Sequence, residues 1–177
     1  MNIERFIDLI GSSLNLIKQE YFMITTTYRP LGIVRERVFC YELYHQMRCL
    51  QEEMGLGEIH IHGEIDKSGH DLFRDAPRNP DFIFHVPGTM DNNSIVVEVK
   101  GSIRDKAGVL KDLQTLSKFT DDKHKYCCGI LVIFNTSMEE FKRLVEEYLN
   151  LKIVAEGLSI NRIMVLCKKK YGAPVES

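Results

Sequence analysis

A nearly continuous apolar run extends from Tyr126 to Phe134. Runs of this kind are typical of a central β-strand that is covered by other elements on both faces. The hydrophobic period predicts an amphipathic helix over about 105–119, between this run and an earlier apolar strand at 94–100. Strand, helix and strand in that order favour a right-handed parallel crossover. We therefore expect an α/β sheet layered with helices.

The other elements follow from local periodicity and turn chemistry. Helices are predicted over about 3–20, 33–54 and 138–149, and strands over about 58–62, 81–86 and 161–167. Pro87-Gly88 and Asp91-Asn92-Asn93 predict a turn that joins the strands at 81–86 and 94–100 into a hairpin. Two segments are predicted to lack regular structure of their own: an arm or linker at 21–32 and a long polar loop at 66–79.

A chain of 177 residues is long enough for one ordinary globular domain. We divide it into an N-terminal helix and arm (1–32), the main domain (33–170) and a tail (171–177), with Lys168-Lys169-Lys170 and the tail expected to be solvated. No apolar run approaches the ~20 residues that a membrane span needs, and the first residues do not resemble a secretion signal. The expectation is a cytoplasmic protein without a membrane partner.

The overall charge limits how the chain could bind nucleic acid. Its formal charge is −2 and its pI is near 6.3, whereas proteins that neutralise many phosphates are usually basic. Binding would therefore depend on a local patch. Basic residues do gather near one hairpin in the sequence, although acidic residues between them also fit an ordinary surface: Arg74, Arg78, Arg104, Lys106 and Lys111.

The charged residues of this hairpin occupy its two strand ends. Asp81 opens the first strand, directly after Pro80, and Glu98 and Lys100 close the second. In an antiparallel pair the start of one strand lies beside the end of the next, so the three side chains are expected to meet. Glu98 and Lys100 are two residues apart and project from the same face. An apolar strand that ends in these charges must solvate them or use them.

Two neighbouring carboxylates favour binding of a divalent cation. Asp81 and Glu98 are hard oxygen ligands that repel each other unless Mg²⁺ or Mn²⁺ lies between them, and the backbone carbonyl of Val99 is a further candidate ligand. A metal there would polarise a phosphodiester and lower the pKa of a coordinated water. Lys100 would orient that water and offset charge that develops on the phosphate.

Pro80-Asp81, sixteen intervening residues and Glu98-Val99-Lys100 resemble the signature of the PD-(D/E)XK nuclease superfamily, which includes restriction endonucleases and Holliday-junction resolvases. The resemblance implies a restriction-endonuclease-like mixed sheet with an αβββαβ core flanked by helices, here with an extra N-terminal helix. It also implies an acidic residue on the first core helix. Glu36 fits this role and Glu42 competes with it, while Gln114 is the candidate polar residue on the helix after the third strand.

The function that the resemblance implies is metal-dependent hydrolysis of DNA, in defence, repair or a mobile element. A homodimer or a partner protein would then supply specificity, because no separate recognition motif is visible. The alternative is a catalytically inactive nuclease-like domain that binds nucleic acid or a partner protein. Two other interpretations stay open: a same-face ion pair of Glu98 with Lys100, and a metal site formed by His60 and His62 with Glu64 or His70.

Overall fold

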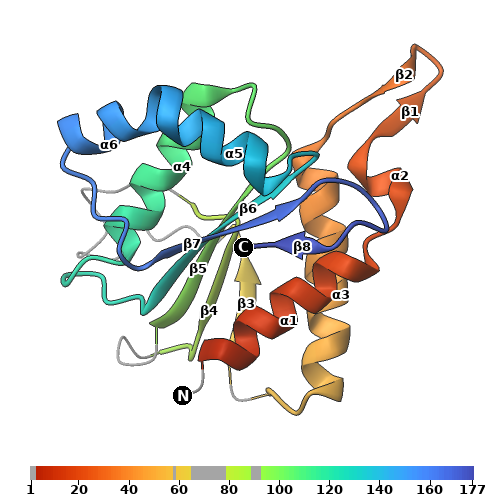
Figure 1. Cartoon of the computed structure of the whole chain (residues 1–177). Coiled ribbons are helices and arrows are strands. Elements are labelled where there is room, and N and C mark those ends of the chain that lie inside the picture. Colours follow the sequence, from red (N-terminus) through yellow and green to blue (C-terminus); the bar gives the residue numbers. More distant parts are fainter. Residues whose placement is uncertain (1–2, 58, 65–78, 89–92) are drawn as a thin grey trace.

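A computed structural model describes residues 3–57, 59–64, 79–88 and 93–177, and in these ranges the chain has a mixed α/β fold (Figure 1). The N-terminal part contains α1 (Ile3–Leu16), α2 (Gln19–Phe22), β1 (Ile24–Thr26), β2 (Arg29–Ile33) and α3 (Glu36–Glu53). The middle part contains β3 (His60–Gly63), β4 (Phe82–His85), β5 (Asn93–Lys100), α4 (Lys106–Phe119) and β6 (Cys128–Phe134). The C-terminal part contains α5 (Met138–Leu144), the π-helical η2 (Val145–Leu149), α6 (Asn150–Ala155), β7 (Ile163–Lys168) and β8 (Val175–Glu176).

Six strands form the main sheet in the order β3-β4-β5-β6-β7-β8. The first three pair antiparallel as a meander, β5, β6 and β7 are parallel, and β8 returns antiparallel to β7. The structure thus confirms both the predicted hairpin of β4 with β5 and the predicted parallel crossover through α4. Strand β6 lies inside the sheet, and all but its first residue are buried, as its apolar run predicts.

Helices cover both faces of the sheet and create two separate cores. Helices α1 and α3 pack on one face, in a cluster that includes Leu9, Phe39 and Val97. Helices α4 and α5 pack on the other, in a cluster that includes Val96 and Leu113. Figure 1 shows this three-layer arrangement, with α1 and α3 to the right of the sheet and α4, α5 and α6 to its left. Helix α1 therefore shares one core with the main domain.

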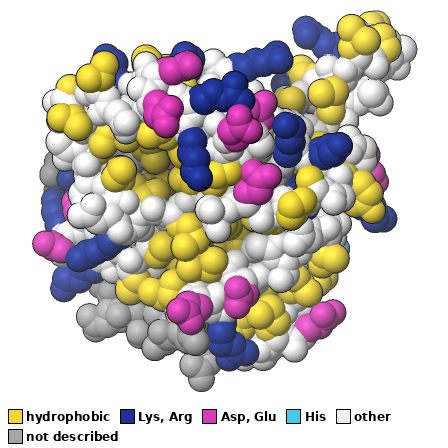
Figure 2. All heavy atoms as spheres, viewed as in Figure 1, with side chains coloured by type: hydrophobic (Ala, Val, Ile, Leu, Met, Phe, Trp, Pro, Cys, Tyr) yellow, Lys and Arg dark blue, Asp and Glu magenta, His cyan; other side chains and the backbone are white. Residues whose placement is uncertain are grey.

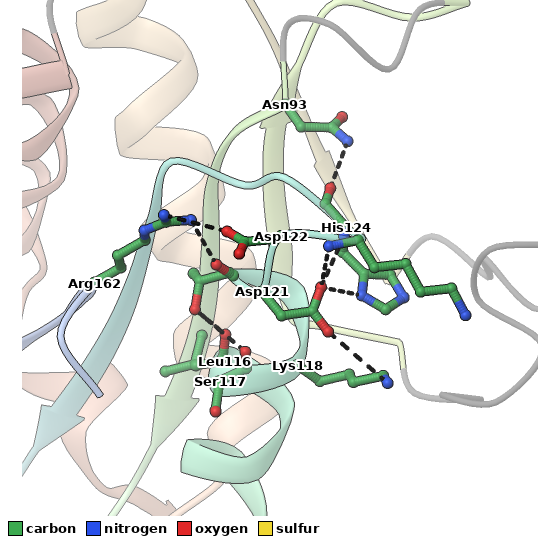
Figure 3. A network of polar contacts seen from close by, with 10 residues as sticks. Asn93, Leu116, Ser117, Lys118, Asp121, Asp122, His124 and Arg162 are labelled. Carbon is green, nitrogen blue, oxygen red and sulfur yellow. Dashed lines mark hydrogen bonds and ion pairs between the residues drawn. The ribbon is translucent and has the colours of Figure 1, made fainter. Parts of the chain in front are cut away.

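Polar contacts around Asp121 fix the end of α4 (Figure 3). The Oδ1 atom of Asp121 accepts hydrogen bonds from the backbone N–H groups of Lys123 and His124, at 2.9 and 2.8 Å, and lies 2.7 Å from Nδ1 of the buried His124 ring. Arg162 Nη1 donates to the carbonyl of Thr120 at 3.0 Å, which ties the start of β7 to the same turn. This network holds α4 against the sheet and so fixes the side chains that α4 presents.

Several predicted boundaries change in the structure. The predicted arm is a two-stranded hairpin, β1 with β2, which projects away from the main sheet (Figure 1). The second helix begins at Glu36 rather than near residue 33, and the helix predicted over 138–149 continues through η2 and α6 to Ala155. Arg74, Arg78 and nearly all of the predicted 66–79 loop lie outside the described residues.

The prediction of a solvated C-terminal segment is confirmed for Lys169 and Lys170, which are exposed, and is wrong for Lys168. Lys168 is only 1% exposed, and its ammonium donates to Oδ1 of Asn15 at 2.6 Å and to the carbonyl of Ala173. Residues Val175–Glu176 pair with the end of β7 instead of lying free. The contact of Lys168 with Asn15 joins segments that are distant in sequence, which periodicity does not report. No helix among the described residues is long and apolar enough to cross a membrane.

Candidate functional site

The β4–β5 hairpin brings Asp81 and Glu98 together. Phe82 pairs with Val97, so continuing this antiparallel register by one residue places Asp81 opposite Glu98. The backbone N–H of Val99 donates a 2.7 Å hydrogen bond to Oδ2 of Asp81, which holds that carboxylate at the strand end. The two carboxyl groups also share a side-chain hydrogen bond. The convergence predicted from the turn chemistry is therefore present.

Strand alternation directs Glu98 and Lys100 toward α4. Val97 and Val99 belong to the core on the α1 and α3 side, whereas Val96 belongs to the core on the α4 side. Because side chains alternate along a strand, Glu98 and Lys100 project to the same side as Val96. The polar end of β5 therefore faces the helix that follows it.

The paired carboxyl groups are buried, and nearby negative charges disfavour their ionised forms. Glu98 is 8% exposed, and burial together with the charges of Asp81 and Asp112 raises its pKa well above the ordinary value. Burial also raises the pKa of Asp81; nearby Glu36 adds to the rise and the Val99 hydrogen bond opposes it. A carboxylate pair with raised pKa values gains stability either from a proton or from a bound cation.

Lys100 is held between two acidic residues. Its Nζ atom lies 3.2 Å from Oδ2 of Asp112 and 3.6 Å from Oε1 of Glu36, and its side chain is 12% exposed. Burial alone would lower the pKa of the ammonium group, but Asp112 and Glu36 together raise it above its ordinary value. Lys100 therefore stays charged, and its contacts with Glu36 and Asp112 fix its position.

Asp112 is a site residue that the sequence interpretation missed, as are Asn79 and Thr115. It lies on α4, and burial raises its pKa to about 6 although Lys100 opposes the rise. Its Oδ2 atom is buried and lies 3.2 Å from the ammonium of Lys100. One signal was available: Asp112 falls on the apolar stripe of its helix, between Val109 and Leu116, where a charge needs a partner.

Glu36 and Glu42, the two candidate acids on α3, have different hydrogen-bond partners. Glu36 is the first residue of α3, and its Oε1 atom accepts a 2.9 Å hydrogen bond from the N–H of Gly101, directly after Lys100. Glu42 instead accepts a 2.7 Å hydrogen bond from Gln46 on the same helix and lies near Tyr21. The structure thus brings Glu36, and not Glu42, to the charged end of β5.

Gln114 does not join the site. Its amide donates a 2.6 Å hydrogen bond to Glu156 at the end of α6, and Asp112 occupies the place on α4 that we assigned to it. Asp112 and Gln114 are two residues apart on α4, so their side chains point to different sides of the helix. The residues of α4 that line the site are Lys111, Asp112 and Thr115.

These side chains line a pocket of about 460 Å³. Most of its lining is polar, in contrast to the apolar walls of an ordinary small-molecule cavity. Its lining residues are Glu36, Asn79, Asp81, Glu98, Val99, Lys100, Lys111, Asp112 and Thr115. Every predicted catalytic and metal-binding residue is among them.

The predicted basic rim is distributed over more than one surface. Lys111 lines the carboxylate pocket, and Arg104 lines a neighbouring cavity. Lys106 lies over the ring of Tyr148, with Nζ 5.6 Å from the ring centroid, so it faces α5 and η2 instead. Arg74 and Arg78 fall outside the described residues.

Strand β3 carries His60 and His62, and it places one of them against a histidine of β4. Nδ1 of His62 lies 2.8 Å from Nε2 of His85, so these two rings contact each other, while His60 is exposed. His70 lies outside the described residues. In the part of the chain that the structure describes, no three His, Cys, Asp or Glu side chains together form a metal-binding group.

The donor set of the carboxylate pocket still fits Mg²⁺. This ion uses one or two protein carboxylates and keeps several waters, so it does not require three acidic side chains. Asp81 and Glu98 supply two hard oxygen donors in mutual contact, and Val99 lines the same pocket. Soft or imidazole-based metal sites need ligands that this pocket does not have among its lining residues.

Comparison of the chain with protein-family models, with curated proteins and with solved structures finds no match.

Proposed function

We propose that the chain is a Mg²⁺- or Mn²⁺-dependent phosphodiesterase that hydrolyses DNA, built on a PD-(D/E)XK nuclease core. The observation that carries the proposal is the meeting of Asp81, Glu98 and Lys100 in one polar pocket at the end of β5. A structural ion pair on an exposed strand would account for neither the burial of Glu98 nor its contact with Asp81.

The order of elements also supports the proposal. Helix α3, the meander β3-β4-β5, helix α4 and strand β6 follow one another as the αβββαβ core that the resemblance implies. The pocket lies beside the start of β4 and the end of β5, where the charged residues of this core are found. Fold alone does not establish an activity, so the residues of the pocket carry the assignment.

Each pocket residue has a role that follows from its contacts. Asp81 and Glu98 would hold the metal, with the Val99 carbonyl as a further ligand. When bound, the metal would polarise the phosphodiester and lower the pKa of a coordinated water. Lys100, kept charged by Asp112 and Glu36, would donate a hydrogen bond to the attacking water or to a phosphate oxygen on which charge develops. Glu36 and Asp112 are positioning residues, since they act through Lys100.

Titration calorimetry and a cleavage assay test this assignment together. We expect Mg²⁺ to bind the wild-type chain, the double variant Asp81→Ala plus Glu98→Ala to lose that binding, and cleavage of DNA to require added Mg²⁺ or Mn²⁺. Exposed carboxylates provide the matched control, Asp122→Ala plus Glu156→Ala. Metal binding that survives in the site variant would contradict the metal assignment. Metal binding without cleavage of any DNA or RNA substrate would favour the inactive, binding-only alternative.

A further inference from the structure

A second concave surface lies next to the carboxylate pocket. It is a groove of about 1050 Å³, and Glu36 lines both cavities. Gly101 and Ser102 follow β5, Asn135 follows β6, and Lys169-Lys170 follow β7, and all of them line the groove. The groove therefore runs along the carboxyl ends of the three parallel strands, which is where open α/β sheets bind their ligands.

The charge of this groove is opposite to that of the chain. The whole chain carries −2, whereas the groove has five cationic and two acidic lining residues. Its cations come from the start of α3, from the β5–α4 connection and from the end of β7: Arg35, Arg37, Arg104, Lys169 and Lys170. Figure 2 shows Lys and Arg side chains toward the upper part of this face, near the foot of the β1–β2 arm, with Asp and Glu side chains between them.

The ion pairs that these cations make are exposed and exchangeable. Arg37 lies 3.2 Å from Glu64, and Lys169 lies 3.9 Å from Glu140, with each of the four side chains more than 40% exposed. Surface pairs of this kind are worth little, so a phosphate group can replace the carboxylate at small cost. The cations thus remain competent to bind a polyanion.

An exposed aromatic side chain completes the groove. Tyr41 is 65% exposed and lines the groove from α3, two turns or less from Arg35 and Arg37, and Met23 lines it from the base of the arm. A basic track combined with an accessible aromatic ring is the combination that binds single-stranded nucleic acid, because unpaired bases stack on the ring. A base-paired duplex keeps its bases stacked inside and uses the cations only.

We infer that this groove binds a single-stranded segment of nucleic acid, with phosphates on its Arg and Lys side chains and a base on Tyr41. This inference rests on the proposed function in one respect: a strand in the groove would lead past Glu36 to the phosphodiester at Lys100. The preferred substrate would then carry a single-stranded segment beside the bond that is cut.

Binding can be measured apart from cleavage. Fluorescence anisotropy in EDTA, with a fluorescein-labelled oligothymidylate and with a tail-less hairpin duplex, should show tighter binding of the single strand. We expect Lys169→Ala plus Lys170→Ala to weaken that binding about tenfold or more. The variant should also reduce the slope of log K against log salt by about 1.4, since two phosphate contacts are lost.

The matched control is Lys142→Ala plus Lys152→Ala, which removes the same charge from exposed positions of α5 and α6. It should bind like the wild type. Tyr41→Ala should weaken single-strand binding by about tenfold, while Tyr41→Phe should retain it, because stacking needs the ring and not the hydroxyl. Melting temperatures check that each variant is folded.

Each contrary result overturns the inference. Equal losses in the two lysine pairs would mean a non-specific charge effect, and equal binding of the duplex would remove the single-strand assignment. A chain that binds neither probe and forms dimers that the Lys169 and Lys170 variant dissolves would identify the groove as a protein interface. Single-strand binding without metal-dependent cleavage would leave the groove assignment standing and refute the nuclease, so the two failures are distinguishable.

Discussion

Nζ of Lys100 lies 3.2 Å from Oδ2 of Asp112, a carboxylate that α4 presents to the end of β5. Oε1 of Glu36 lies 3.6 Å from the same ammonium, and the two acids together keep it in place. The position of the Lys100 ammonium therefore depends on how α4 packs on the sheet as well as on the hairpin itself.

Asp112→Asn should reduce cleavage by about tenfold, as expected for loss of a supporting partner next to a metal site. Because Asp112 raises the pKa of Lys100, its removal should also shift the basic limb of the pH–rate profile toward lower pH. The measurement is kcat/KM against pH for the wild type, for Asp112→Asn and for the exposed control Asp122→Asn. An unshifted profile in Asp112→Asn would show that Lys100 does not titrate in the reaction.

Lys100→Met should lower the cleavage rate by ~10²–10³-fold, the usual loss on removing one transition-state donor. Methionine keeps most of the aliphatic stem, so the chain should stay folded, with a lower melting temperature because Asp112 loses its cation. Lys100→Arg should not restore activity, because a planar guanidinium does not fit between Asp112 and Glu36 as the compact ammonium does. Calorimetry should show that both variants still bind Mg²⁺. A Lys100→Met protein that cuts normally would rule out the role assigned to Lys100.

Glu36→Gln should reduce activity more than Glu42→Gln, with both proteins folded. Glutamine at position 36 can still accept the Gly101 hydrogen bond, but it loses the charge that acts on Lys100. Glu42 accepts a hydrogen bond from Gln46 and is not among the residues that line the pocket, so its replacement serves as the matched control on the same helix. Equal activities would reduce Glu36 to a residue that only anchors the backbone of Gly101.

The metal-free chain should lose stability as the pH rises. Burial raises the pKa of Asp112 to about 6 in the folded chain, above the ~3.9 of an unfolded aspartate, so the folded state holds the proton more tightly. The contribution of Asp112 to the free energy of unfolding is fully present below about pH 4 and is lost as the pH rises through 6. The loss is roughly 3 kcal/mol at most. The raised pKa values of Asp81 and Glu98 act in the same direction.

Thermal unfolding in EDTA across this pH range measures the effect. Added Mg²⁺ should recover stability at neutral pH, because the cation replaces the proton between the carboxylates. Asp112→Asn should flatten the pH dependence in part, while Asp122→Asn should leave it unchanged. Stability that rises with pH in the metal-free chain would contradict the pKa directions on which this expectation rests.

The close approach of α3 to the end of β5 also explains why residue 101 is glycine. A Cβ atom there would lie 2.5 Å from Cγ1 of Val34 and 3.0 Å from the ring of Phe134. Any larger residue would push the start of α3, and with it Glu36, away from Lys100. The sequence shows the glycine, but only the packing of three distant segments shows what it permits.

The amino-acid sequence by itself determined the local parts of this protein. A period of two along 94–100 placed Glu98 and Lys100 on one face, and turn residues placed Asp81 at the adjacent strand end. The apolar run at 126–134 required a strand inside the sheet. These outcomes depend on interactions between near neighbours in the chain, which is why a periodic pattern records them.

Tertiary structure alone decided the partners of Lys100. Choosing Glu36 over Glu42 required the true start of α3, and finding Asp112 instead of Gln114 required the rotation of α4 against the sheet. The same holds for Lys168, whose ammonium reaches Asn15 near the other end of the chain. Contacts between distant segments arise from the packing of whole elements, where a rotation of one residue about a helix axis replaces one side chain by another. No local pattern encodes that rotation.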